Sequence, residues 1–147
     1  MRVAREVALA VAAERVWQAL WDVPRMVGCV PGCVEAREVE PRRRYQARMS
    51  QRVGPIALTV PLDIRVTDES PGCLTLHARG RDSRLAAEVQ MSVRLAVEAS
   101  ETGSRLVVEA EGRVLGKLGA LGAGVIQRRA EELVDEFTAR LREAVGG

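Results

Sequence analysis

Residues 14–33 read ERVWQALWDVPRMVGCVPGC and decide the fold that the sequence predicts. The first part of this segment repeats apolar residues at the spacing of one helical face, namely Val16, Trp17, Leu20 and Trp21. We therefore predict a helix from about Ala13 to Trp21. Asp22-Val23-Pro24 ends it, because proline disfavours helical geometry in the residue that precedes it. A second short helical turn follows and closes at Pro31-Gly32.

Most of the remaining chain alternates apolar and polar residues with a period of two, which is typical of strands with one buried face. The predicted strands cover residues 2–10, 34–39, 45–53 and 56–67, a segment with Leu74, Leu76 and Ala78 on one face, residues 85–97, and a last segment from 106 to 114. Pro- and Gly-containing turns separate several of these segments. The pattern predicts an antiparallel sheet with one buried and one solvated face.

One long helix, predicted for residues 117–145, is the large element that can cover the apolar face of the sheet. Its first part, GKLGALGAGVI (116–126), is small and apolar, and its second part is charged and amphipathic. Each glycine weakens a helix by up to about 1 kcal/mol relative to alanine. Two explanations for the four glycines are open: a close approach to the sheet or a late helix start, and a helix that leaves room beneath it for a ligand. A dinucleotide-binding fingerprint is excluded by the glycine spacing.

Composition narrows the function classes. The 147 residues predict one domain, 1–147, and 47% of them are apolar, which is typical of a globular protein. Only four residues are aromatic, so a core of Val, Leu and Ala can leave interior space unfilled. The net charge of +2, without a basic stripe, argues against nucleic-acid binding. No apolar run approaches the length of a transmembrane span.

The three cysteines, Cys29, Cys33 and Cys73, fit free thiols in a reducing compartment, and we expect a cytoplasmic protein without a Cys29–Cys33 disulfide. A structural zinc site needs four ligands and the chain has one histidine, His77, so no metal site is predicted. The apolar run at residues 7–13 loosely imitates a signal peptide. Arg5 and Glu6 interrupt its start, and a first strand is the better interpretation.

Several motifs, taken in order, resemble one known family. VWQAL (16–20), Asp22, CVPGC (29–33), VGPI (53–56) and GKLGALGAGVIQRRAEELVDEFTARL (116–141) are similar to the G subunit of carbon monoxide dehydrogenase, within the START-like, polyketide-cyclase-like (SRPBCC) superfamily. The resemblance implies an α+β helix-grip fold: about seven antiparallel strands curled around a long C-terminal helix, with two short helices between strands one and two.

The resemblance also implies a hydrophobic cavity between the sheet and the long helix, which holds a lipid-like or aromatic small molecule. Members of this family accompany molybdenum-containing carbon monoxide dehydrogenases, recruit the enzyme to the membrane and handle quinone. For this chain it therefore implies a bound quinone or other hydrophobic ligand, no covalent cofactor, a molybdenum-containing dehydrogenase as partner, and peripheral contact at the inner face of the membrane.

Strand parity and the composition of the long helix suggest which residues line this cavity. The candidates are Trp21, Met49, Gln51, Val60, Met91, Leu118, Leu121 and Val125, with Cys29, Pro31 and Gly32 in a loop at the cavity lip. A pocket of this kind is mostly apolar with a few placed polar groups. Arg5 and Gln51 share the parity of the cavity-facing positions. Each either reaches a ligand carbonyl or carboxylate, or lies near a strand end and emerges into water.

Catalysis is not predicted. His77 lies on the strand face opposite Leu76 and has no evident nucleophile as partner, and no acidic pair is aimed at a pocket. Arg42-Arg43-Arg44 is either a solvated turn or a contact for acidic lipid or an acidic partner. Two further functions stay open: a stand-alone lipid or metabolite carrier, and a cyclase or hydrolase that uses the same cavity.

Overall fold

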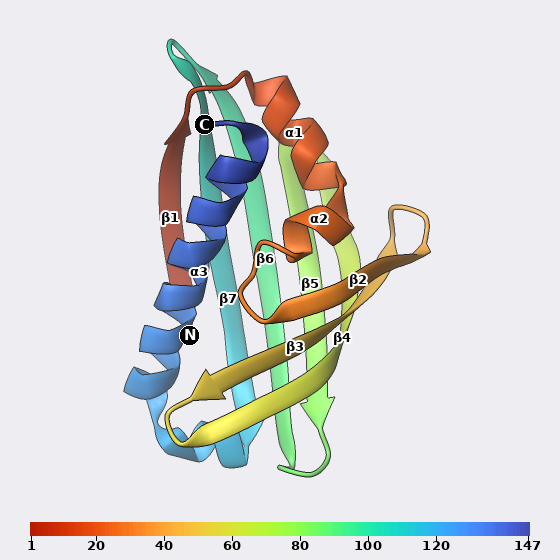
Figure 1. The fold of residues 1–147 in the computed structure, drawn as a ribbon, viewed down its shortest axis with the longest axis vertical. Helices are drawn as coiled ribbons and strands as arrows, with labels where there is room; N and C mark the ends of the chain where they lie inside the picture. Colours follow the sequence, from red (N-terminus) through yellow and green to blue (C-terminus); the bar gives the residue numbers. More distant parts are fainter.

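The computed structural model describes all residues, 1–147, and contains one seven-stranded antiparallel sheet (Figure 1). The strands are β1 (Arg2–Leu9), β2 (Cys33–Glu40), β3 (Arg44–Val53), β4 (Ile56–Ser70), β5 (Cys73–Asp82), β6 (Ala87–Ser100) and β7 (Gly103–Gly116). Their order across the sheet is β1-β7-β6-β5-β4-β3-β2, so that every strand from β2 to β7 pairs with its neighbour in sequence. β1 pairs with β7, so that the first and last strands of the chain lie side by side at one edge of the sheet.

Two short helices connect β1 to β2 and cover one end of the sheet (Figure 1). Helix α1 spans Ala13–Trp21 and buries Val16 and Leu20, and α2 spans Val23–Val27 with a proline in its first turn. Proline is tolerated there because the first amides of a helix have no partner within the helix. The predicted helix and its end before Pro24 are confirmed.

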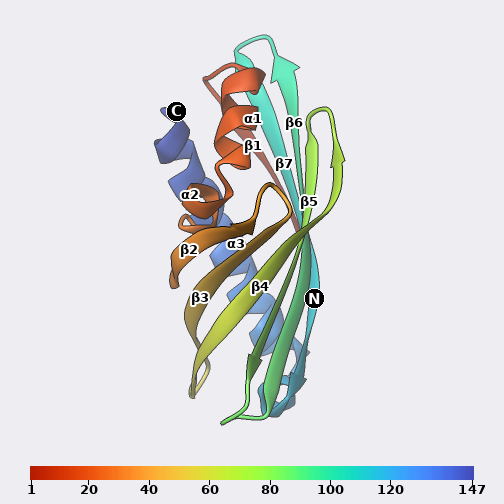
Figure 2. The same cartoon turned by 90° about the vertical axis from the view of Figure 1, so that its right-hand side faces the viewer.

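The sheet curls so strongly that β2 and β3 cross in front of the central strands (Figure 1), and in the side view they lie on the same side of those strands as helix α3 (Ala123–Val145) (Figure 2). Alternate residues of β3 and β4 are buried under this curl, as the period-two pattern predicts. The predicted helix-grip architecture, a curled antiparallel sheet around a C-terminal helix, is confirmed.

Helix α3 is anchored at its C-terminal end. Phe137, Leu141 and Val145 are buried among α1, β1 and the sheet, and they belong to the same core cluster as Leu20 and Leu106. The Arg142 guanidinium donates a hydrogen bond to the carbonyl of Ala8 on β1. These contacts fix the long helix against the end of the sheet that α1 and α2 already cover.

Two predicted boundaries are wrong. The expected single helix over 117–145 is a 3₁₀ turn, η1 (Lys117–Leu121), followed by α3, because Gly122 has a φ of 94° that a right-handed helix excludes. The expected strand start at Leu85 lies in the β5–β6 turn, where the Leu85 amide donates to the Asp82 carboxylate at 3.2 Å.

Candidate functional site

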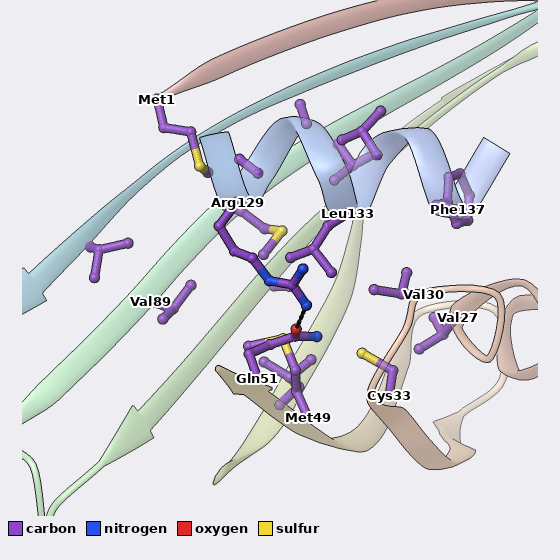
Figure 3. Close-up of a pocket in the computed structure, with 18 of the residues that line it drawn as sticks. Met1, Val27, Val30, Cys33, Met49, Gln51, Val89, Arg129, Leu133 and Phe137 are labelled. Carbon is purple, nitrogen blue, oxygen red and sulfur yellow. Dashed lines mark hydrogen bonds between the residues drawn. The ribbon is translucent and has the colours of Figure 1, made fainter. Parts of the chain in front are cut away.

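A cavity of about 190 Å³ lies between α3 and the concave face of the sheet (Figure 3). Hydrophobic residues make up 24 of the 26 that line it, so that its chemistry is that of an apolar pocket. The α3 residues in the lining are Ile126, Arg129, Ala130, Leu133, Val134 and Phe137. The inward faces of β3 to β7 form the opposite wall, and Val27, Val30 and Cys33 come from the α2–β2 region.

The two polar lining residues, Gln51 on β3 and Arg129 on α3, contact each other across the cavity (Figure 3). Arg129 Nη2 donates a hydrogen bond of 2.7 Å to Gln51 Oε1. Gln51 is 7% exposed, and its Nε2 donates to the carbonyl of Pro31. This chain of contacts joins the long helix, the third strand and the loop before β2.

Arg129 also contains a buried donor without a partner. Its Nη1 forms an ion pair of 3.0 Å with Glu132 Oε2, and its Nη2 is bonded to Gln51, but the inaccessible Nε has no hydrogen-bond partner. A buried donor without an acceptor destabilises the protein by about 1–3 kcal/mol, and more where the group is charged. The orphaned Nε therefore marks a position where an acceptor from a bound molecule would be stabilised.

The loop before β2 is held against β3 by a glycine that no other residue can replace without strain. Gly32 has a φ of 81°, and a Cβ atom there would lie 2.0 Å from the carbonyl oxygen of Ser50. The Ser50 amide donates to the Gly32 carbonyl at 2.9 Å. The predicted lip loop is thus fixed in place beside Gln51.

The two cysteines of this loop differ in position. Cys33 lines the cavity, and burial raises the pKa of its thiol to about 11. Cys29 is also buried, but it lies outside the cavity and its Sγ contacts the carbonyl oxygen of Arg25 at 3.6 Å. A thiol with a raised pKa is protonated at neutral pH and is a poor nucleophile.

Of the predicted cavity residues, the structure brings four together in the lining: Met49, Gln51, Met91 and Leu118. Of the predicted lip residues, Pro31 contacts the site through its carbonyl, which accepts from Gln51. The residues of this loop that reach the cavity itself are Val30 and Cys33, not Cys29, Pro31 or Gly32.

Four other predicted cavity residues lie outside it. Val60 is 0% exposed but packs over Gly80 instead of lining the cavity. A Cβ atom built at Gly80 would lie 2.9 Å from the Cγ2 atom of Val60. Leu121 and Val125 lie against the β3–β4 turn, both 3.9 Å from a Cβ built at Gly54, because the break at Gly122 redirects the chain there.

Trp21, the fourth of these predicted cavity residues, packs outside the cavity. Its ring meets that of Trp17 edge-on with centroids 6.1 Å apart, and the Arg42 guanidinium lies 3.9 Å above it. Of the arginine triplet, Arg44 pairs with Asp63 at 2.7 Å, so that two of the three arginines are engaged within the protein.

Arg5 shares strand parity with the cavity but does not enter it. Its Nε donates to Asp135 Oδ1 on α3 at 2.8 Å, at the exposed edge of the sheet. The hydrogen bond to Asp135 raises the pKa of Arg5. Because β1 is an edge strand beside α3, an inward-pointing long side chain there reaches around the helix to solvent.

Arg129 is the functional candidate that the sequence prediction missed, because its charge groups it with the solvated face of the helix. The signal is present in the sequence: Arg129 follows Ile126 by three residues and precedes Leu133 by four, which places it on the cavity face of α3. An arginine inside an apolar helical stripe is the kind of exception that indicates a site.

Other surfaces offer less chemistry. The outer face of β2 to β5 has a shallow groove lined mainly by charged and polar side chains, such as Arg48, which pairs with Glu35 at 3.1 Å. No group of three or more His, Cys, Asp or Glu side chains is arranged to hold a metal ion. None of the helices combines the length and apolar character needed to span a membrane.

The chain is similar to one known family and to several solved structures. The CoxG family, named for the G subunit of carbon monoxide dehydrogenase, matches residues 6–146. A conserved protein of Geobacillus kaustophilus has the same fold, with a TM-score of 0.86 at 19% identity, over 99% of this chain and 95% of that one. The ZhuI aromatase/cyclase of Streptomyces is similar with a TM-score of 0.63 at 17% identity, over 99% and 90%. No curated protein matches the chain in sequence.

Proposed function

The chain belongs to the CoxG family, which is named for the G subunit of carbon monoxide dehydrogenase. On this premise we propose that it binds a hydrophobic, quinone- or lipid-like molecule beneath α3. The observation that carries the proposal is the cavity itself, which has hydrophobic residues at 24 of its 26 lining positions. Transfer of apolar surface from water into such a site is favourable by about 25 cal/mol per Å². A ligand with an extended apolar body is therefore the class that this cavity suits.

We further propose that the protein acts as a carrier rather than as an enzyme. The lining contains no carboxylate and no imidazole, and the thiol of Cys33 has a pKa raised to about 11 by burial. His77 alternates with the lining residues Leu76 and Ala78 and so belongs to the opposite face of β5. A cyclase or hydrolase would need an acid–base pair in the cavity.

The family supports a role as accessory protein of a molybdenum-containing carbon monoxide dehydrogenase, to which the bound molecule would be presented. We propose that it does so in the cytoplasm, with peripheral contact at the inner face of the membrane. Co-purification of the tagged protein with a dehydrogenase from its native host tests the partner. A protein that binds its ligand but recovers no dehydrogenase would instead be a stand-alone carrier.

Native mass spectrometry of the purified protein, followed by organic extraction, tests the cavity. We expect a co-purifying quinone or lipid, or binding of added menaquinone. Ala130→Trp fills the cavity from α3, whereas Ala139→Trp places the same side chain on the exposed face of that helix. Binding that survives Ala130→Trp, or a protein that is empty and binds neither menaquinone nor fatty lipids, would refute the proposed function.

A further inference from the structure

We propose that the Arg129–Gln51 pair binds an acidic head group, so that the preferred ligand is an amphipathic carboxylate whose chain fills the apolar cavity. This inference rests on the proposed function and adds to it the chemistry of the ligand's polar end. It starts from an asymmetry in the cavity wall: the two polar residues among 26 lie together, bonded to each other at 2.7 Å, instead of being scattered. The rest of the lining offers no comparable place for a polar group.

The donors of Arg129 show what is missing at this position. A guanidinium has five N–H donors and no acceptor. Glu132 accepts from Nη1 at 3.0 Å and Gln51 accepts from Nη2 at 2.7 Å, whereas Nε is inaccessible and unbonded. The edge formed by Nε and Nη2 is thus occupied by one neutral oxygen, although it can hold two acceptors.

A carboxylate fits this edge better than a neutral oxygen does. Its two oxygens match the Nε and Nη2 donors in a bidentate arrangement, and hydrogen bonds between two charged groups are about twice as strong as neutral ones. One ligand oxygen would satisfy Nε, and the other would replace Gln51 Oε1 at Nη2. A single carbonyl oxygen, as in a neutral quinone, has no such matched pair.

Gln51 has a second contact that does not involve Arg129. Its Nε2 donates to the Pro31 carbonyl, so that the amide is held by the loop before β2 even when Oε1 gives up its contact with Arg129. Glu132 stays on Nη1, on the part of the guanidinium away from the Gln51 contact. Glu132 therefore need not move when an external carboxylate takes the place of the Gln51 oxygen.

Binding of dodecanoate and 1-dodecanol at pH 8 tests this inference, because the two probes share a chain and differ in the head group. In a cavity that lacked Arg129, dodecanol should bind more tightly than dodecanoate, since burying an ionised carboxylate is unfavourable unless it is paired. In the wild-type protein we expect dodecanoate to bind more tightly than dodecanol by about 10- to 100-fold. Calorimetric titration of both probes gives this ratio.

Arg129→Gln should remove the preference for dodecanoate and leave dodecanol binding unchanged. Arg128→Gln makes the same charge change at the exposed neighbouring position and should keep the wild-type ratio. If R129Q fails to fold, Arg129→Lys keeps the charge without the paired donors and should lower the ratio. An R129K protein with the wild-type ratio would overturn the bidentate geometry.

The outcomes separate this inference from the proposed function. Equal affinity for both probes in the wild-type protein overturns the acidic head group and leaves a general apolar carrier. If both R129Q and R128Q lose the preference for dodecanoate, the preference comes from overall charge, and the proposed head-group site at Arg129 is overturned. A wild-type protein that binds neither probe, nor menaquinone, removes the proposed function itself.

Discussion

The two halves of α3 face the same sheet but meet different surroundings. In the C-terminal half, Leu141 is 2% exposed and packs with α1 and the covered end of the sheet. In the N-terminal half, Ile126, Arg129 and Leu133 line the cavity, and each is only half-buried. The difference shows that one end of the helix contributes stability, while the other leaves the space that a ligand can fill.

The cause lies in what covers each end. Helices α1 and α2 add a second layer over the packed end, so that residues such as Leu20 and Leu106 have neighbours on all sides. At the other end only α3 and the 3₁₀ turn η1 face the sheet, and the Arg129–Gln51 hydrogen bond spans the gap between helix and strand. Three substitutions and the ionisation of Cys33 test this contrast.

The largest effect is expected at the packed end. Leu141→Ala removes a fully packed side chain and leaves a void, which destabilises a protein by about 2–5 kcal/mol. Chemical denaturation measures the change in the free energy of unfolding. A loss below about 1 kcal/mol would mean that the two ends of α3 are equally loose.

A smaller loss is expected from Gly32→Ala in the loop beside the cavity. A Cβ there would lie 2.0 Å from the Ser50 carbonyl oxygen, at a φ of 81° that side chains rarely adopt. Strain of this kind costs about 1–3 kcal/mol. Gly124→Ala is the control, since its Cβ would meet open space in a helix, and it should be neutral or slightly stabilising.

The counterpart of Leu141→Ala at the hollow end is Leu133→Ala. Leu133 lines the cavity, so one side of it has no packed neighbours and its removal forfeits fewer contacts. We expect a loss of about 1 kcal/mol, with a larger change in ligand affinity than in stability. Denaturation and ligand titration on the same variant measure both. A loss as large as that of Leu141→Ala would contradict the contrast.

The last prediction concerns Cys33, whose raised pKa affects stability only at alkaline pH. Its folded-state pKa of about 11 lies above the ordinary value of 9.0, so that between these two values the unfolded chain binds fewer protons than the folded one. Unfolding free energy should therefore fall as pH rises through this window.

A thiol-reactive chromophore measures the same property at pH 8. Half-exposed Cys73 should react first, whereas Cys33 should react slowly and more slowly still with the cavity occupied. Cys73→Ser removes the fast phase and serves as the assignment control. A Cys33 that reacts as fast as Cys73, or whose rate ignores ligand, would place it outside the cavity.

The fold is largely predictable from the sequence, and the site only in part. The alternation in residues 56–67 and the helix at residues 13–21 are predicted correctly because each depends on local spacing. Strand parity leaves two alternatives for Arg5, and the structure shows the exposed one, because β1 is an edge strand beside α3. Arg129 is not predicted because a charged residue is assigned to the solvated face of α3 unless its spacing from the apolar residues of the helix is considered first.

Met49 and Val60 show where sequence information ends. They are paired on adjacent strands, share a face and are both buried, yet Met49 lines the cavity and Val60 does not. The amino-acid sequence by itself determined which residues point inward, because strand alternation and Pro or Gly breaks act between near neighbours. Only the tertiary structure decided which inward residues border an unfilled space. That depends on the distance between α3 and the curled sheet, and this distance is fixed jointly by many contacts between residues far apart in the chain.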